Sequence, residues 1–355
     1  MDAITFIKKD LTFASRETED GLRYPIENLT DYPGIGDFLA EMKAKCFDRY
    51  GCMTVAEAPG VSGDTFRRYA GENGYFSMIF DFTWENMEGE TDKSSVEAVE
   101  RWKQRILESQ RFTSEAGWSG LFLENHDQSR CVNKYLEKDQ IGFAGASAMA
   151  VMYFYLCGTP FIYQGQEIGM RDDPKQSIQG FVDKPTFAIY DRLIAEGKTD
   201  AEALEQINRE SREHSRTPMQ WDASAEAGFT TGTPWFPVNK NYTELNYEAE
   251  EKDPDSLLWF YRKMVAVRRR EDLEETFLYG TLIPEYETVS GVLAYRRKDE
   301  KNNILILTTS LADGITLPFT DTIEEVLLNN YDTCEAGEET IRLQPYQCLV
   351  LKVKE

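Results

Sequence analysis

Apolar and polar positions follow a regular rhythm along the first half of the chain. Short apolar runs that end in polar or turn-forming residues predict strands within 52–60, 74–82, 117–127 and 158–170. Longer segments with apolar residues at helical spacing predict helices over 36–49, 95–110 and 142–157. Strands separated by helices are typical of parallel βα units, so we expect an α/β region here.

The rhythm breaks after residue 170. Helices are predicted around 186–213, followed by the loop "SRTPMQWDASAEAGFTTGTPWFPVN", and together they suggest an insertion at about 171–240 over the strand ends. An amphipathic helix follows over 253–271, and we expect Asp253, before Pro254, to cap it.

The last part of the chain has a strand pattern. The runs "SGVLAYRRK", "NILILTTS", "EEVLLNN" and "QCLVLKV" are separated by turn residues, as in an antiparallel sheet. We therefore predict two domains, an α/β domain over 1–275 and a small antiparallel β domain over 276–355.

Charge excludes two classes of partner. The chain has 355 residues with 39 Lys and Arg against 62 Asp and Glu, a formal net charge of −23. Nucleic-acid binding needs a basic surface, and an anionic membrane would repel such a chain. Apolar runs stay below the roughly 20 residues of a membrane span.

Cysteine and histidine usage argues against a metal centre. The six cysteines lack CxxC spacing, which favours free thiols in a reducing cytoplasm. His126 and His214 are the two histidines, too few for a His-rich site. We therefore expect a cytoplasmic protein with no metal ligands and no cofactor.

Three carboxylates stand at or near the ends of predicted strands. In a parallel barrel these ends meet at one rim, so Asp2, Glu57 and Asp127 can surround one ligand. Two carboxylates about 5–5.5 Å apart are the machinery of a retaining glycosidase, one as nucleophile and one as acid/base. The simpler alternative is that each caps a helix or faces solvent, which is the commoner role of a lone strand-end carboxylate.

The sequence around two of the carboxylates favours the chemical interpretation. Glu57 lies between Ala56 and Ala58 and before Pro-Gly, which is not the setting of a solvated face. The run "ENHDQSR" places a histidine, an aspartate and an arginine together at a strand end, a combination suited to sugar hydroxyls.

Several motifs now carry a family resemblance. "ENHDQSR" resembles the NHDxxR motif of glycoside hydrolase family 13, the α-amylase clan, and "MTVAEAPGVS" resembles its general-acid motif, in which Gly usually stands where Ala56 is. "SRTPMQWDASAEAGFTTGTPW" is similar to a loop of the oligo-1,6-glucosidase and α-glucosidase branch, and "GTPFIYQGQEIGM" to the eighth barrel strand.

The resemblance implies a fold and a set of roles. The fold is the C-terminal half of a (β/α)8 TIM barrel with an inserted loop subdomain, followed by a small antiparallel β domain. Asp2 is implied as nucleophile, Glu57 as acid/base and Asp127 as transition-state stabiliser. The substrate-binding residues are implied to be His126, Arg216 and Arg130, with a structural ion pair as the open alternative for Arg130.

The first residues match only the tail of the family's nucleophile motif, G-[FL]-R-x-D. "MDAI" supplies the aspartate, but the glycine, hydrophobic residue and arginine before it are absent, and so are the first four strands. The apolar positions Ile4, Phe6 and Ile7 suggest the end of a buried strand. We therefore expect a fragment that begins inside the barrel. The calcium site of many relatives would lie in the missing part.

The resemblance implies a retaining hydrolase that releases α-linked glucose from the non-reducing end of short oligosaccharides. The branch indicates α-1,6 linkages, whereas Ala3, where α-1,6 enzymes usually have Val, favours α-1,4 or mixed specificity. The alternative is an inactive fragment or half of a split enzyme. Its partner would be a complementary N-terminal chain, or a second copy that covers the open barrel edges.

Overall fold

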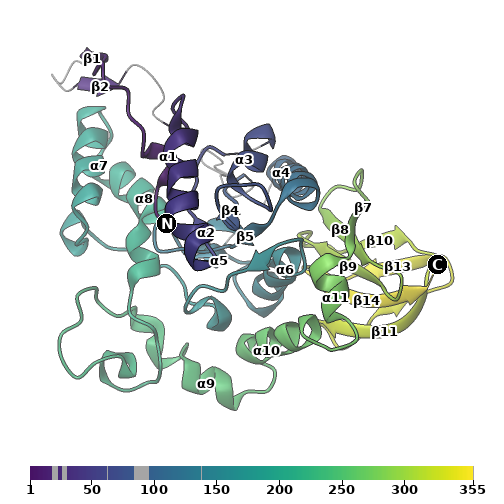
Figure 1. Cartoon of the computed structure of the whole chain (residues 1–355). Helices are drawn as coiled ribbons and strands as arrows, with labels where there is room; N and C mark the ends of the chain where they lie inside the picture. Colours follow the sequence, from purple (N-terminus) through teal and green to yellow (C-terminus); the bar gives the residue numbers. More distant parts are fainter. Residues whose placement is uncertain (18–22, 26–29, 62, 84–95, 137, 355) are drawn as a thin grey trace. The chain divides into compact units, whose positions relative to one another are not determined.

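The computed structural model describes residues 1–17, 23–25, 30–61, 63–83, 96–136 and 138–354 (Figure 1). The chain divides into two compact units. Unit 1 consists of Met1–Gly89, Glu100–Leu121 and Leu156–Pro160, and unit 2 of Glu90–Val99, Phe122–Tyr155 and Phe161–Glu355.

Unit 1 contains a parallel sheet of short strands. Their order is β3-β4-β5-β6, and each pair is parallel. The strands are β3 (Val55–Ala56), β4 (Met78–Phe80), β5 (Ser119–Leu121) and β6 (Thr159–Pro160). The predicted parallel α/β arrangement is confirmed.

Helices precede and separate these strands. The predicted helix over 36–49 is a continuous helical run made of α1 (Ile35–Met42), the π-helix η2 (Lys43–Phe47) and α2 (Asp48–Tyr50). The predicted helix over 95–110 is α4 (Val96–Ala116), and α3 (Phe66–Tyr69) lies between β3 and β4. An antiparallel pair, β1 (Ser15–Glu17) with β2 (Arg23–Pro25), precedes α1.

The start of the chain differs from the predicted strand. Residues Ile4–Phe6 form a 3-10 helix, because Ala3 adopts a left-handed conformation (φ 46°, ψ 41°) that ends the extended backbone. The alternation therefore does not mark a strand. Ile4 is fully buried in the core of unit 1, packed among residues of the α1 and β3 segments that include Ile35, Leu39 and Ala56.

Unit 2 begins with helices. The inserted segment contains α7 and α8, as expected for 186–213. The helices are α5 (Cys131–Tyr135), α6 (Phe143–Phe154), α7 (Lys184–Ala195), α8 (Asp200–Glu210), α9 (Tyr247–Lys252), α10 (Leu257–Arg268) and α11 (Glu274–Tyr279). In the described parts of the chain, no helix combines the length and apolarity that crossing a bilayer requires.

The cap of α10 is not the predicted one. The Ser256 hydroxyl accepts a hydrogen bond from the Trp259 amide at 3.4 Å and caps the helix. Asp253 instead accepts from the Asp255 amide at 3.0 Å, which closes the turn before the helix. Pro254 therefore lies in this turn and not at the start of the helix.

Two antiparallel sheets form the C-terminal part of unit 2, as predicted. One has the order β11-β14-β9-β8-β7 and the other β10-β13-β12. The strands are β7 (Thr281–Glu285), β8 (Val292–Lys298), β9 (Asn303–Thr309), β10 (Ile315–Pro318), β11 (Thr322–Asn329), β12 (Glu335–Ala336), β13 (Thr340–Leu343) and β14 (Cys348–Lys354). Buried side chains of both sheets share one core, which includes Leu305, Leu317 and Leu351.

Candidate active site

The two predicted catalytic residues of unit 1 lie on neighbouring segments of the chain. The Met1 ammonium donates to the Val55 carbonyl at 2.8 Å, and the Glu57 amide donates to the Met1 carbonyl at 2.8 Å. The Ile4 amide then donates to the Glu57 carbonyl at 3.0 Å. These bonds fix Asp2 beside Glu57 at the carboxyl end of β3.

A side-chain contact joins the same two segments. The Ala3 amide donates to Glu57 Oε2 at 3.1 Å. Ala3 makes this hydrogen bond in its left-handed backbone conformation. A non-glycine residue in this conformation costs about 1–2 kcal/mol, and such strain is common near functional groups. Asp2 is exposed and Glu57 half-buried, so both carboxylates are accessible.

Asp127 has several polar contacts within unit 2. Its amide donates a hydrogen bond to Asn125 Oδ1 at 2.8 Å. Its Oδ1 atom accepts from Arg212 Nη1 at 3.0 Å and also from Arg216 Nη2. His126 Nε2 lies 3.4 Å from Asp127 Oδ2. The carboxylate is therefore oriented by cations while 43% of its side chain stays exposed.

Arg216 links the two residues of the "HD" pair. Its Nε donates to the His126 carbonyl at 2.7 Å, and its Nη2 contacts the Asp127 carboxylate. The His126 imidazole itself is 69% exposed, so its ring can reach a ligand. The structure thus brings together His126, Asp127 and Arg216.

Arg212 and Asp183 were not predicted, yet they belong to this network. Arg212 Nε donates to the Asp183 carboxylate, and this hydrogen bond lowers the pKa of Asp183. The same bond raises the pKa of Arg212. Arg212 therefore bridges Asp183 and Asp127 as a permanent cation. The signal was available in "REHSR", which places two arginines four residues apart beside the recognised loop.

Arg130 lies in the interior of unit 2 and not at an accessible surface. Its side chain is fully buried, and Nη1 donates to Glu124 Oε2 at 3.0 Å and to the Gln164 carbonyl at 2.7 Å. Glu124 in turn accepts from the Cys131 amide at 2.9 Å. These contacts favour the ion-pair alternative for Arg130 over direct contact with a sugar.

His214 anchors the 3-10 helix Arg212–Arg216, of which it is part. It is buried, its Nδ1 accepts from the Asp173 amide at 3.1 Å, and its Nε2 lies 2.8 Å from the Asn208 carbonyl. Because burial disfavours the imidazolium, the pKa of His214 falls to about 4. A neutral His214 therefore holds the 3-10 helix Arg212–Arg216, from which both arginines reach Asp127.

A cavity of about 240 Å³ opens beside Asp127. Asp127, Asp183 and Arg212 form its polar side, and Ile189 of α7 and Ile207 of α8 its apolar side. Such a mixed lining suits a polyhydroxylated ring, which has both polar edges and apolar faces.

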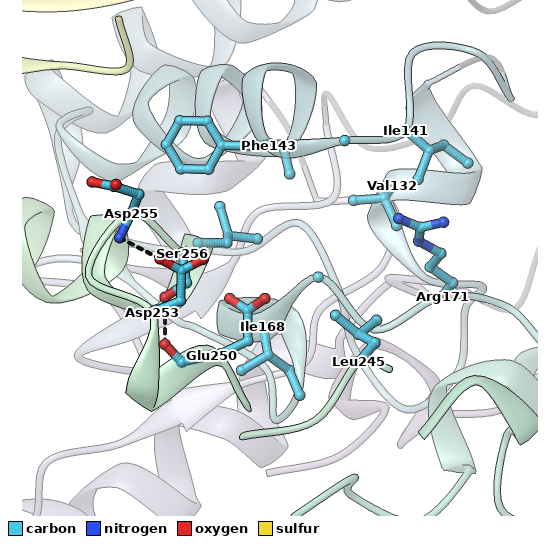
Figure 2. Close-up of a pocket in the computed structure, with 14 residues that line it drawn as sticks. Val132, Ile141, Phe143, Ile168, Arg171, Leu245, Glu250, Asp253, Asp255 and Ser256 are labelled. Carbon is cyan, nitrogen blue, oxygen red and sulfur yellow. Dashed lines mark hydrogen bonds between the residues drawn. The ribbon is translucent and has the colours of Figure 1, made fainter. Parts of the chain in front are cut away.

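A second cavity of unit 2, of about 220 Å³, contains none of the predicted site residues (Figure 2). Phe143, Ile141 and Ile168 contribute apolar side chains, with Glu250 at one side and Arg171 at another. Glu250 accepts from the Leu258 amide at 3.2 Å, and burial raises its pKa. This carboxylate therefore has a structural task at the start of α10.

The cysteines are free thiols. In the described part of the chain, no set of three or more His, Cys, Asp or Glu side chains is arranged to hold a metal ion.

The comparisons with known proteins settle the family. The model of the alpha-amylase catalytic domain matches residues 1–276. The chain belongs to the alpha-amylase family.

Relatives of this chain within the alpha-amylase family include oligo-1,6-glucosidases. A probable oligo-1,6-glucosidase of Bacillus subtilis is 35% identical over 99% of this chain, and an oligo-1,6-glucosidase of Parageobacillus thermoglucosidasius is 32% identical over 100%. The chain covers 64% and 65% of these two proteins, so it spans about two thirds of their length.

Solved structures of the family share the fold. The chain matches a trehalose-6-phosphate hydrolase of Bacillus licheniformis with a TM-score of 0.84 and 30% identity, covering 100% of this chain and 64% of that one. It matches an isomaltulose synthase of Klebsiella sp. LX3 with a TM-score of 0.86 and 28% identity, covering 99% and 64%.

Proposed function

We propose that this chain carries the catalytic carboxylates of a retaining α-glucosidase, with Asp2 as nucleophile and Glu57 as acid/base. The observation that carries the proposal is the pairing of the two segments. The Glu57 amide donates to the Met1 carbonyl and the Ala3 amide to the Glu57 carboxylate, which holds Asp2 between two contacts. Retaining glycosidases need two carboxyl groups close together, and neighbouring segments can supply them.

The reaction proceeds in two displacements. In the first, an Asp2 carboxylate oxygen bonds to the anomeric carbon while the glycosidic bond breaks and the Glu57 proton passes to the leaving oxygen. In the second, a water molecule gives a proton to the Glu57 carboxylate. The oxygen of this water bonds to the anomeric carbon while the ester bond to Asp2 breaks. Two inversions retain the configuration, and no metal or cofactor takes part.

We propose that Asp127, His126 and Arg216 bind a glucose unit of the substrate. The Asp127 carboxylate accepts from sugar hydroxyls and stabilises positive charge at the anomeric carbon. The exposed His126 ring donates to a hydroxyl. Arg216 orients Asp127 through their hydrogen bond.

The proposed substrates are short oligosaccharides with a non-reducing α-linked glucose. Relatives named oligo-1,6-glucosidase support α-1,6 linkages, while Ala3 supports α-1,4 or mixed specificity. We further propose a cytoplasmic location, which six free cysteines support.

Glucose release from an aryl α-glucoside, from maltose and from isomaltose tests the activity. We expect turnover by the 355-residue chain, alone or together with an N-terminal barrel half, and none by Asp127→Ala in the same setting. Activity that Asp127→Ala retains in full would reject the assignment.

A second candidate, half of a split enzyme, has its own supporting observation. Within the described residues, the segments before β3 carry exposed large apolar side chains, with Leu11 at 78%, Phe13 at 81% and Met53 at 73% exposure. Such side chains are typical of a surface that another chain covers. The full set is Met1, Ile7, Leu11, Phe13, Phe38, Tyr50 and Met53.

The partner would be a complementary N-terminal chain or a second copy. Light scattering separates these cases: self-association that Leu11→Gln/Phe13→Gln reduces supports a second copy. A monomer that is inactive alone and active with a co-expressed N-terminal half supports the complementary chain. A monomer with full activity rejects both.

A further inference from the structure

Unit 1 has a large cleft at the end of the sheet opposite to Glu57. The cleft measures about 640 Å³, within the range of roughly 300–1,000 Å³ for small-molecule sites. Thr54, Ser77 and Trp118 line it, and they directly precede β3, β4 and β5. Glu57 directly follows β3. The cleft therefore lies at the amino ends of the strands and is separate from the proposed active site.

We name this feature the amino-end cleft and define it by Phe47, Cys52, Thr54, Glu72, Tyr75 and Trp118.

One wall of the amino-end cleft is formed by the irregular end of the first helical run. The π-helix Lys43–Phe47 presents Lys43 and Phe47 to the cleft, and π-helical turns occur frequently at functional sites. Lys43 Nζ lies 3.1 Å from Asp48 Oδ1, so this cation already has a carboxylate partner. The wall is therefore apolar with a neutralised rim.

The other walls provide aromatic side chains that are fixed in place. Trp118 Nε1 donates to Thr159 Oγ1 at 2.7 Å. The Tyr75 hydroxyl lies against Gly36, where an added Cβ would come within 2.5 Å. The Phe47 ring packs on the buried Phe76 ring with centroids 5.8 Å apart. Flat apolar surfaces are thus available before any ligand binds.

The polar groups of the cleft are hydroxyls and carboxylates. The hydroxyls can donate or accept hydrogen bonds, and the carboxylates accept them and repel anions. The Thr54 and Ser77 hydroxyls lie 3.4 Å apart, with Ser77 exposed. Glu72 is exposed, and Glu115 pairs with Arg67 at 2.9 Å. Carboxylates and hydroxyls beside aromatic rings suit a neutral polyhydroxylated ring, whose edges donate and whose faces are apolar. Phosphates and carboxylates do not fit this charge.

We infer that the amino-end cleft is a second, non-catalytic carbohydrate site that binds short neutral oligosaccharides. The choice of α-glucose oligosaccharides as its ligand rests on the proposed function, whereas the shape and chemistry of the cleft do not. Bound there, an oligosaccharide would keep the chain near its substrate without occupying the catalytic carboxylates.

Cys52 gives a direct test, because it is exposed and lines the cleft. The rate of alkylation by iodoacetamide is measured for each cysteine by peptide mass spectrometry, with and without isomaltotriose or maltotriose. Cys46 is the internal control. It is exposed and lies in the π-helix Lys43–Phe47, which forms one wall of the cleft, but Cys46 itself does not line the cleft. We expect the sugar to slow Cys52 at least threefold and to leave Cys46 unchanged.

Variants assign the effect to the cleft. Glu72→Ala should weaken the protection several-fold, whereas the exposed neighbour Asn73→Ala should preserve it. Equal slowing of Cys46 and Cys52, no slowing of either, or protection by spermidine instead of sugar would overturn the inference.

The test also separates this site from the proposed active site. Asp127→Asn should abolish hydrolysis and leave the protection of Cys52 intact. Protection of Cys52 in a chain that hydrolyses no glucoside would reject the proposed function alone. Hydrolysis without protection would reject the second site alone.

Discussion

The Arg216 side chain donates two hydrogen bonds to the "HD" pair. Its Nη2 donates to the Asp127 carboxylate, and its Nε donates to the His126 carbonyl at 2.7 Å. The guanidinium thus fixes both the backbone and the carboxylate of the "HD" pair. A lysine has a single ammonium and cannot form this fork.

Arg216→Lys is therefore expected to lower kcat/KM for an aryl α-glucoside by about 10²-fold, the scale of a misplaced catalytic group. Arg192→Lys on the exposed face of α7 is the matched control and should leave kcat/KM within a factor of two. Equal activity of the two variants would show that the fork does not position Asp127.

Glu57→Ala should reveal the acid role through the leaving group. Loss of general acid catalysis costs about 10²–10⁴-fold in rate, but a phenol of low pKa departs without a proton. We expect hydrolysis of isomaltose to collapse and hydrolysis of an activated aryl glucoside to fall far less. Equal losses on both substrates would contradict a proton-donor role for Glu57.

The lowered pKa of His214 should make the stability of the protein depend on pH. Its pKa is about 4 in the fold against 6.5 in the unfolded chain, so the unfolded chain binds more protons between these values. The free energy of unfolding should fall as the pH drops from 6.5 to 4, by up to on the order of 3 kcal/mol from this group.

Two histidines make this prediction simple to check, because His126→Asn leaves His214 as the single imidazole. Its NMR titration should have a midpoint near 4 in the folded chain. A midpoint near 6.5 would mean that the imidazole is solvated and does not brace the Arg212–Arg216 segment.

Ala3 should be a position where glycine stabilises the protein. Its φ of 46° is strained for alanine, and glycine removes that strain at some cost in unfolded-chain entropy. We expect Ala3→Gly to raise the free energy of unfolding by about 0.5–1 kcal/mol in urea titrations. A decrease of that size would show that Ala3 is extended in solution, with its amide turned from Glu57.

Periodicity and motifs predicted most of the elements, because strand and helix patterns are local. The parallel order of β3 to β6 and the C-terminal sheets followed from such patterns. The start of the chain did not, since the three apolar positions after Ala3 fit a strand and a 3-10 turn equally well. The cap of α10 was misassigned because Asp253 and Ser256 both fit a capping pattern, and only the hydrogen bond to Trp259 decides.

Part of the candidate site could not be predicted from local sequence patterns. Arg212 and Asp183 approach Asp127 from the inserted segment, at a separation along the chain of 85 residues in the case of Arg212. The burial of Arg130 depends on Glu124 and on the Gln164 carbonyl. Contacts of this kind arise from tertiary packing and leave no periodic trace in the sequence.

Trapping of the glycosyl-enzyme tests the central proposal most directly. A 5-fluoro-α-glucosyl fluoride reacts with the nucleophile of a retaining α-glucosidase to give an ester that hydrolyses slowly, and peptide mass spectrometry locates it. We predict one added fluoroglucosyl group on the N-terminal peptide, at Asp2, and none in Asp2→Asn. A label on Asp127 or on any other carboxylate, or a preparation that hydrolyses the aryl α-glucoside and remains unlabelled, would contradict Asp2 as the nucleophile.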